Sequence, residues 1–447
     1  MDQPIISVSG LRGIVGQSLS PQLVIRYIAA FSQNIPPGPI LLGTDGRPSG
    51  HLLAEIIRGS LGMLGRDVVY AGVCATPTVG VLTREHKCAG AIQISASHNP
   101  PEYNGLKLMG SDGRVISAIE GEEVLKSYSN DEATWVDHSK IGQSQNCEDT
   151  ISAHCQLVLD RVDVEKIKQK NFNVLLDSNG GAGSILGKIL LEKLGCTVTT
   201  LGDGADGNFL HRPEPTAENL VDVGKKTTEL GADIGFCQDP DADRLAVIDE
   251  TGRYIGEEYT LALCLENVLA KTPGPVVTNC ATSRMNQDIA EKYGSEFHQS
   301  KVGEANVTGL MKEVSAVFGG EGNGGPIDPQ VGLIRDSFVG MAYTLDLMAS
   351  RQQPISQLAN ALPRYEIIKS KVTVPKEQIP AAIDAIEAHF SEAKSNREDG
   401  LRLDWDDRWL LIRASNTEPI VRVIAETKSA QLSTQLCEEA AQVIEKL

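Results

Sequence analysis

Three segments of the chain share one local pattern, in which a short apolar strand leads into a loop of small residues and then into an amphipathic helix. The apolar strands cover 39–43, 173–177 and 275–279, and the loops after them read TDGRPSG, SNGGAGS and CATSR. Short apolar runs that alternate with amphipathic stretches are typical of α/β proteins. Because the strands begin 134 and 102 residues apart, the pattern predicts one α/β domain repeated three times.

The last part of the chain follows a different pattern. After about residue 365 come an alternating strand, an amphipathic helix, three further strands and a final helix, which predicts a compact α+β domain. Earlier breaks fall at the polar stretch 139–150, which we interpret as a linker, and at the turn-rich stretch 249–258. The sequence therefore predicts three similar mixed α/β domains and a smaller C-terminal α+β domain, with the boundaries 1–148, 149–250, 251–364 and 365–447.

Composition limits the classes of partner. Acidic residues number 59 against 41 basic ones, a net charge of −18, and aromatic residues make up only 4%. This balance argues against nucleic acid, which is bound through Lys and Arg contacts to phosphates and through stacking. No apolar run reaches the length of about 18 residues that a membrane helix needs, and the nine cysteines form no metal-binding or disulfide pattern. We therefore expect a cytoplasmic protein without a nucleic-acid or membrane partner.

The most specific motif is the segment AIQISASHNPPEYNGLKLM at 91–109. Its strand ends in a polar loop that two prolines stiffen, which predicts that Ser97 lies at an exposed strand-to-loop corner. A serine at such a corner can act as a nucleophile if His98, Lys107 or a cation polarises it. The residues alone leave two other interpretations open, a helix-capping turn and a structural role for His98.

A second motif, GFCQDPDADR at 235–244, carries Asp239, Asp241 and Asp243 at alternate positions. An extended segment or turn can direct all three carboxylates to one point, and oxygen ligands of this kind suit Mg²⁺. Without a cation the three charges would repel one another, so the motif predicts a metal site. Arg244 follows directly and can contact the phosphoryl oxygens that the metal polarises.

Two further loops offer groups for a sugar phosphate. The segment GGEGNGG at 319–325 places Glu321 and Asn323 among five glycines, where they can hold sugar hydroxyls, although a flexible turn would have the same composition. In IRASNTEPIVRV, Arg413 and Arg422 flank a Ser-Asn-Thr loop that can cradle a phosphate, the alternative being a surface hairpin. A serine, a metal site, a sugar loop and a phosphate cradle are the parts that phosphoryl transfer requires.

In their order along the chain, these motifs resemble those of the α-D-phosphohexomutases, which include phosphoglucomutases, phosphomannomutases and phosphoglucosamine mutases. The resemblance covers essentially the whole chain and includes SGLRG at 9–13, which is similar to the family's first substrate loop. It implies four domains around a central cleft. It also implies a phosphoserine enzyme that interconverts the 1- and 6-phosphates of a hexose or hexosamine through a bisphosphate intermediate, with a 1,6-bisphosphate as primer.

The resemblance also implies roles for individual residues. Ser97 would carry the phosphoryl group and, with Asp239, Asp241 and Asp243, hold Mg²⁺. The remaining expected site residues are Arg12, Lys107, Arg244 and His98 around the transferring group, Glu321 and Asn323 at the sugar, Lys301 in the substrate cleft, and Arg413, Ser415, Asn416, Thr417 and Arg422 at the other phosphate. The general acid or base stays open between His98, Lys107 and the metal alone.

The sugar loop departs from the family pattern, because many members have Ser at Asn323 and His at Gly325. The form of the serine loop is similar to the glucosamine branch, so glucosamine phosphate ranks first and a broad phosphomannomutase/phosphoglucomutase second. Two other classes are weighed against a mutase. An aspartate-nucleophile phosphatase would use Asp239, but Asp243 stands where its motif needs Thr or Val. A non-catalytic sugar-phosphate sensor would not need the intact serine.

Overall fold

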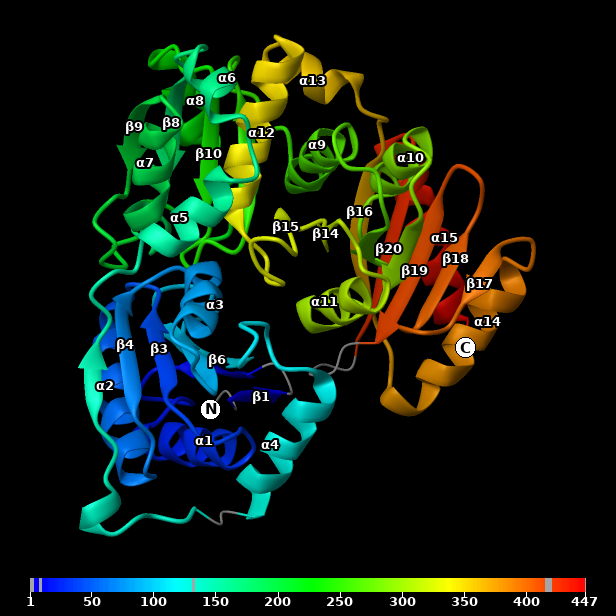
Figure 1. Ribbon diagram of the computed structural model, residues 1–447. Coiled ribbons are helices and arrows are strands. Elements are labelled where there is room, and N and C mark those ends of the chain that lie inside the picture. The colour runs from blue at the N-terminus through cyan, green and yellow to red at the C-terminus, as the bar shows by residue number, and fades with distance from the viewer. Residues whose placement is uncertain (1–3, 8–9, 131–132, 415–419, 447) are drawn as a thin grey trace.

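The computed structural model describes residues 4–7, 10–130, 133–414 and 420–446. These residues form four β-sheets with their helices, and Figure 1 shows that the four units follow one another in an arc, the first (blue) at one end and the fourth (orange and red) at the other. This architecture confirms the predicted class, three mixed α/β units and a smaller α+β unit. Within the described ranges, no helix is both long enough and apolar enough to cross a lipid bilayer.

The first unit contains a seven-stranded sheet in the order β1-β2-β6-β5-β3-β4-β7. Its strands are β1 (Ile5–Ser7), β2 (Gly10–Ile14), β3 (Ile40–Thr44), β4 (Val68–Val73), β5 (Gly90–Ile94), β6 (Tyr103–Gly110) and β7 (Ser144–Asn146). Its helices are α1 (Pro21–Gln33), α2 (Pro48–Met63), α3 (Thr76–Glu85), α4 (Ala118–Asn130) and the 3₁₀ helix η1 (His138–Lys140).

The second and third units each contain four strands. The second is ordered β11-β10-β8-β9, with β8 (Asn173–Asp177), β9 (Thr197–Leu201), β10 (Ile234–Gln238), β11 (Leu245–Asp249) and helices α5 (Ser152–Leu159), α6 (Val164–Lys168), α7 (Gly183–Lys193) and α8 (Val221–Glu229). The third is ordered β13-β12-β14-β15, with β12 (Val276–Asn279), β13 (Phe297–Ser300), β14 (Phe318–Glu321), β15 (Gly325–Ile327) and helices α9 (Glu257–Leu269), α10 (Met285–Lys292), α11 (Glu304–Glu313), α12 (Ser337–Arg351) and α13 (Ile355–Ala361).

The fourth unit is a five-stranded antiparallel sheet in the order β16-β20-β19-β18-β17. Its elements are β16 (Glu366–Thr373), η2 (Lys376–Gln378), α14 (Ile379–His389), β17 (Lys394–Asn396), β18 (Leu401–Asp404), β19 (Trp409–Ala414), β20 (Ile420–Thr427) and α15 (Ala430–Glu445). Trp409 on β19 is buried in an apolar cluster with Cys280 of the third unit, so the fourth sheet packs directly on its neighbour.

One four-strand arrangement recurs in the first three units. The strand that opens each repeated pattern, β3, β8 or β12, lies between two parallel neighbours. One of these parallel neighbours, β5, β10 or β14, is joined by a hairpin to an antiparallel strand, which is β6, β11 or β15. The repetition predicted from the sequence is therefore present. The serine loop, the aspartate loop and the glycine-rich loop all occupy this same hairpin, one in each unit.

The polar stretch 139–150 is not a free linker. Within it, β7 pairs in parallel with β4 and extends the first sheet, and the Gly142 N–H donates to the Gly62 carbonyl at 3.0 Å. The edge of β4 has main-chain groups that need partners, and an exposed edge strand tolerates polar side chains, which is why the composition resembled a linker. The exact domain boundaries stay a prediction.

A buried polar triplet joins the first three units. Thr78 Oγ1 lies 2.9 Å from His154 Nδ1, and His154 Nε2 lies 2.7 Å from Asp336 Oδ2. All three side chains are buried, and they belong to α3, α5 and the residue that caps α12. Because buried polar groups need hydrogen-bond partners, this triplet favours one relative arrangement of the three units.

Candidate active site

The serine loop begins directly after β5. Ser97 has a left-handed backbone (φ 51°), and its Oγ donates a hydrogen bond to Asp239 Oδ2 at 2.9 Å. The predicted exposure of this corner is wrong, since Ser97 is only 3% exposed. It is covered because the aspartate loop of the second unit packs over it. The contact brings together two motifs that lie 142 residues apart.

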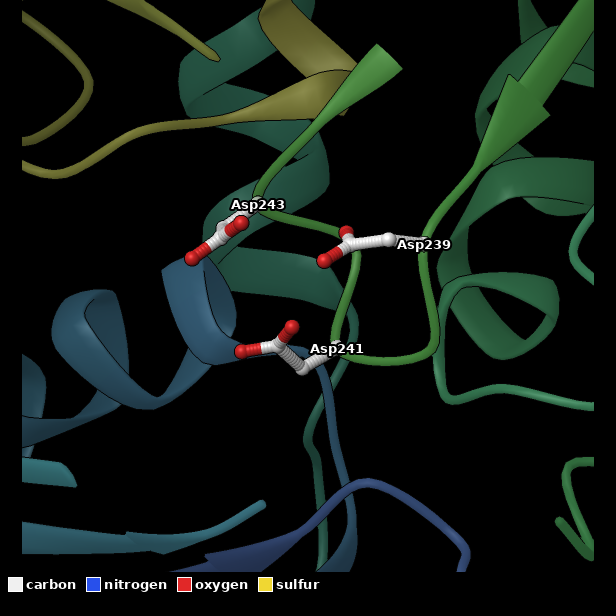
Figure 2. Close-up of side chains that lie close together, drawn as sticks. All are labelled: Asp239, Asp241 and Asp243. Carbon is white, nitrogen blue, oxygen red and sulfur yellow. The ribbon is translucent and has the colours of Figure 1, made fainter. Parts of the chain in front are cut away.

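The aspartate loop connects β10 to β11, and Figure 2 shows its three carboxylates turned toward one another. Asp239, Asp241 and Asp243 are fully buried, and each offers one oxygen within 4.8 Å of the others. The side chain of Thr76, at the start of α3, donates to Asp241 Oδ2 at 2.6 Å. The first unit therefore supplies a wall of this acidic cluster.

Two cations of other elements compensate the acidic charge. Lys107 Nζ, on β6, lies 2.5 Å from Asp241 Oδ2 and 2.6 Å from Asp243 Oδ2, and Arg335 Nη2 lies 2.7 Å from the same Asp243 atom. Burial is the largest single influence on both carboxyls and acts to raise their pKa, but the neighbouring groups together outweigh it. Lys107 and the hydrogen bond from Thr76 lower the pKa of Asp241, and Arg335 with Lys107 lowers that of Asp243, so both pKa values lie below the usual range. Burial and the two neighbouring carboxylates raise the pKa of Asp239 instead.

The cluster has the donor set that a hard cation requires. Within the described part of the chain, Asp241 Oδ1 and Asp243 Oδ1 are buried and accept no hydrogen bond. A buried carboxylate oxygen without a partner is costly, and a divalent cation satisfies several such oxygens at once. Three acidic oxygens without His or Cys favour Mg²⁺ over a transition metal. The three residues thus fit the metal site predicted from their spacing.

Further groups surround the serine. His98 Nδ1 lies 3.3 Å from Ser97 Oγ, and burial together with the charges of Arg244 and Arg12 lowers the pKa of His98 to about 3. Arg12, on β2, donates to Asn99 Oδ1 at 2.8 Å. The Arg244 main-chain N–H donates to Asp239 Oδ1 at 3.1 Å, whereas its buried Nε lies 3.9 Å from Asp243 Oδ1 and makes no hydrogen bond among the described residues. A neutral imidazole therefore lies beside the nucleophile, and two guanidinium groups lie close enough to this imidazole to lower its pKa.

The two polar side chains of the glycine-rich hairpin between β14 and β15, Glu321 and Asn323, differ in how far their oxygens are already hydrogen-bonded. Glu321 is buried, and its Oε1 accepts from Asn279 Nδ2 at 2.7 Å and from the Gly303 N–H at 3.0 Å. Arg335 Nη1 lies 3.2 Å from the other oxygen, Oε2. Asn323 Oδ1 is buried and has no partner in the described part of the structure. Glu321 is thus largely engaged in holding the loop, while the amide oxygen of Asn323 is free for a ligand.

The predicted phosphate cradle lies on the fourth unit. Arg413 and Arg422 are cross-strand partners on β19 and β20, and Lys371 on β16 is the next partner of Arg422. Like charges at directly opposed positions repel, so this row of three cations favours an anion. Arg413 also donates to Asp399 Oδ1 at 2.9 Å, and Lys301 lines a small pocket beside Asp399. The expected ligands Ser415, Asn416 and Thr417 lie outside the described residues.

Comparisons with known proteins identify the family. Models of the phosphoglucomutase/phosphomannomutase α/β/α domains I, II and III match residues 4–135, 152–252 and 257–365, and the model of the C-terminal domain of that family matches 368–443. The chain belongs to the phosphoglucomutase/phosphomannomutase family. It is therefore a phosphohexomutase, an isomerase of sugar phosphates.

Relatives match along the full length of this phosphohexomutase. The phosphoglucomutase/phosphomannomutase of Thermococcus kodakarensis is 35% identical, over 98% of this chain and 97% of its own. The phosphoglucosamine/phosphogalactosamine mutase of Sulfurisphaera tokodaii is 30% identical over 99% of both chains. The crystal structure of a phosphoglucomutase/phosphomannomutase family protein from Burkholderia thailandensis has a TM-score of 0.83 and 26% identity, covering 99% of this chain and 97% of that one.

Sequence reasoning missed two arginines of this phosphohexomutase. Arg335 contacts Asp243, Glu304 and Glu321, and so joins the aspartate loop to the glycine-rich hairpin. It stands in an ordinary segment before α12, and no motif signals its role. The second, Arg47, lies in the loop TDGRPSG, which was recognised only as part of the repeated pattern. Both are identified by their contacts alone.

We expect Mg²⁺ to bind the aspartate cluster and to be required for activity. Chelation with EDTA should abolish turnover and added Mg²⁺ should restore it. Calorimetric titration should show that Asp241→Asn weakens Mg²⁺ binding by at least about tenfold, because even groups outside the ligand set contribute that much to metal affinity. Asp222→Asn, on the exposed surface of α8, is the matched control and should bind like the wild type. Equal affinity in both variants would contradict a metal at this cluster.

Proposed function

We propose that this phosphohexomutase interconverts the 1- and 6-phosphates of a hexosamine, with glucosamine phosphate as its first substrate, through phosphorylated Ser97. The observation that carries the proposal is the contact of Ser97 Oγ with Asp239 Oδ2 at 2.9 Å, inside a cluster of three buried carboxylates. A buried serine at a candidate metal site, with Lys107 and two arginines near it, is suited to hold a phosphoryl group. Phosphoryl transfer depends mainly on such positioning and charge neutralisation.

The chain's own residues account for the transfer as follows. The bond between phosphorus and Ser97 Oγ breaks as a bond to the free sugar hydroxyl forms, while Arg12 and Arg244 compensate the charge on the phosphoryl oxygens. The proton of the sugar hydroxyl ends on the departing Ser97 oxygen, and His98, which is neutral at pH 7 with its Nδ1 3.3 Å from Ser97 Oγ, relays it. Asp241 and Asp243 raise the pKa of Lys107 and keep it protonated. Mg²⁺ bound at the cluster would supply further electrostatic stabilisation of the transferring group.

The second half-reaction returns the other phosphate of the bisphosphate to Ser97. Arg413 and Arg422 would hold whichever phosphate is not being transferred, together with Ser415, Asn416 and Thr417. Asn323 would contact the sugar through its free amide oxygen, with Glu321 orienting the loop and Lys301 near the phosphate. Because the two ends of the bisphosphate are alike in charge, one cradle serves both orientations. A hexose or hexosamine 1,6-bisphosphate would prime the enzyme by phosphorylating Ser97.

The preference for an amino sugar rests on two supports. The serine loop ISASHNP is similar to the glucosamine branch, and one of the relatives is named for phosphoglucosamine and phosphogalactosamine. Another relative is named for glucose and mannose phosphates, so a broad phosphomannomutase/phosphoglucomutase is the second candidate. A cytoplasmic location and the absence of nucleic-acid or membrane partners stay predictions.

A comparison of kcat/KM on glucosamine 6-phosphate, glucose 1-phosphate and mannose 1-phosphate tests the substrate. The assay contains Mg²⁺ and a 1,6-bisphosphate primer. We expect the amino sugar to be preferred by more than tenfold, which corresponds to about 1.4 kcal/mol of transition-state discrimination. Comparable rates on all three would favour the broad mutase. Absence of turnover on every sugar would contradict the mutase function itself.

A further inference from the structure

A buried ion pair lies beneath the serine loop. Asp45 and Arg47 follow β3, and both are at most 1% exposed. Arg47 Nε lies 3.0 Å from Asp45 Oδ2, and the Arg47 N–H donates to Asp45 Oδ1 at 3.1 Å. Neither side chain makes a hydrogen bond to the aspartate cluster in the described structure. Burying two charges has a desolvation cost, which further hydrogen bonds must offset.

Arg47 uses its remaining donors on the backbone of the serine loop. Nη2 donates to the carbonyls of Ser97 and Asn99, each at 2.6 Å, and Nη1 donates to those of Pro100 and Tyr103 at 2.7 and 3.1 Å. With the bond to Asp45, all five guanidinium N–H groups are therefore used. A planar fork of five donors fixes the carbonyls it contacts in direction as well as distance.

Arg47 binds the carbonyl of Ser97, and Asp45 is connected through Ser95 to its N–H. Asp45 Oδ2 accepts a hydrogen bond from Ser95 Oγ at 2.7 Å, and Ser95 Oγ accepts one from the Ser97 N–H at 2.8 Å. The two peptide groups that flank Ser97 are thus both connected to the same ion pair. This matters because Ser97 has a φ of 51°, a conformation that non-glycine residues adopt only when their surroundings hold them there.

The second unit covers the ion pair. The ring of Phe209 lies over the Arg47 guanidinium at 5.0 Å, and a Cβ on Gly207 would lie only 2.7 Å from Arg47 Cα. The same unit carries Asp239, which accepts the hydrogen bond from Ser97 Oγ. Arg47 therefore stands between the backbone of the nucleophile and the unit that supplies its candidate metal ligands.

We propose that Arg47 and Asp45 are positioning residues that hold Ser97 in its left-handed conformation and direct its Oγ toward Asp239. This inference rests on the proposed function of Ser97 as the phosphoryl carrier. Arg47 touches neither the sugar phosphate nor the reacting atoms, so its effect passes entirely through the Ser97 backbone. Misplacement of a reacting group by about 1 Å lowers rates by about 10²-fold.

The test compares Arg47→Lys and Arg47→Met with Arg66→Lys and Arg66→Met in the full chain. Arg66 is a matched control, because it also donates to several backbone carbonyls, those of Ser32, Ile35, Pro36 and Gly38. It lies before the start of β4, whereas the serine loop follows the end of β5, at the opposite end of these parallel strands. We expect the Arg47 variants to lower kcat by about 10²-fold with KM within about threefold of the wild type. The Arg66 variants should lower Tm and leave kcat unchanged.

A second readout isolates the position of Ser97. Single-turnover uptake of a phosphoryl group from glucose 1,6-bisphosphate, followed by intact mass, should slow in Arg47→Lys by the same factor as kcat. Wild-type uptake in an Arg47 variant, or losses of kcat that track Tm equally at Arg47 and Arg66, would overturn the inference. If Arg47→Met does not fold, Arg47→Lys decides the result. Failure of the wild type itself to take up phosphate would instead contradict the proposed function.

Discussion

Replacing Ser97 with alanine is expected to lower the kcat of sugar-phosphate interconversion by about 10⁴-fold or more, because loss of a nucleophile removes the group that carries the reaction. The variant should still fold. Only the hydroxyl is removed, and Asp239 keeps the hydrogen bond from the Arg244 N–H at 3.1 Å. Losing one hydrogen bond to a buried acceptor costs about 1–3 kcal/mol, which a chain of this size tolerates. Initial rates with Mg²⁺ and primer, together with Tm, measure both effects.

The same variant separates the mutase from its main competitor. An aspartate-nucleophile phosphatase would keep its activity in Ser97→Ala and lose it in Asp239→Asn. Ser184→Ala is a matched control. Like Ser97, Ser184 is a buried serine that donates a hydrogen bond, but it lies in the second unit and its acceptor is the carbonyl of Gly181. Ser184→Ala should retain wild-type kcat. Retention of activity in Ser97→Ala would therefore contradict the phosphoserine mechanism.

Replacing Arg335 with methionine is expected to destabilise the protein by about 3–5 kcal/mol, the usual cost of removing one partner from a buried ion pair. Arg335 Nη2 lies 2.7 Å from Asp243, Nε lies 3.2 Å from Glu304, and Nη1 lies 3.2 Å from Glu321. All three carboxylates are buried, and their charges outweigh burial and raise the pKa of Arg335. Without this cation, the acidic groups keep their desolvation cost and repel one another.

Tm and the urea midpoint measure this effect. Arg351→Met, at the C-terminal end of α12, is the control, because Arg351 is 46% exposed and lies 3.8 Å from Glu266. A partly exposed pair of this kind contributes at most about 1 kcal/mol. Similar losses of stability in the two variants would show that the contacts of Arg335 are not a main support of the interface between the second and third units.

The fold could be predicted largely because its pattern is local and repeated. The apolar strand at 173–177 is β8 and the one at 275–279 contains all of β12, and each lies centrally in its sheet as the pattern requires. The edge strand β7 could not be predicted, because an exposed edge strand has the polar composition of a linker. Its position depends on the main-chain groups of β4, which the sequence does not display.

In the candidate site, too, features set by local sequence could be predicted and features set by contacts between distant segments could not. The alternation of Asp239, Asp241 and Asp243 predicts their convergence, because their spacing is short. The burial of Ser97 could not be predicted, since it depends on a contact across 142 residues. Arg335 lies outside every motif, and only packing between units gives it three acidic partners. Residues that act through contacts between units are therefore the ones that sequence reasoning misses.

The most direct measurement follows a labelled phosphoryl group. The protein is phosphorylated with ³²P-labelled glucose 1,6-bisphosphate, the label is located by peptide mapping, and unlabelled glucosamine 6-phosphate is then added with Mg²⁺. We expect the label on Ser97 and its transfer to the sugar phosphate within one turnover. Label on an aspartate, or label on Ser97 that no sugar phosphate removes, would contradict the proposal that Ser97 carries the phosphoryl group between the two positions of the sugar.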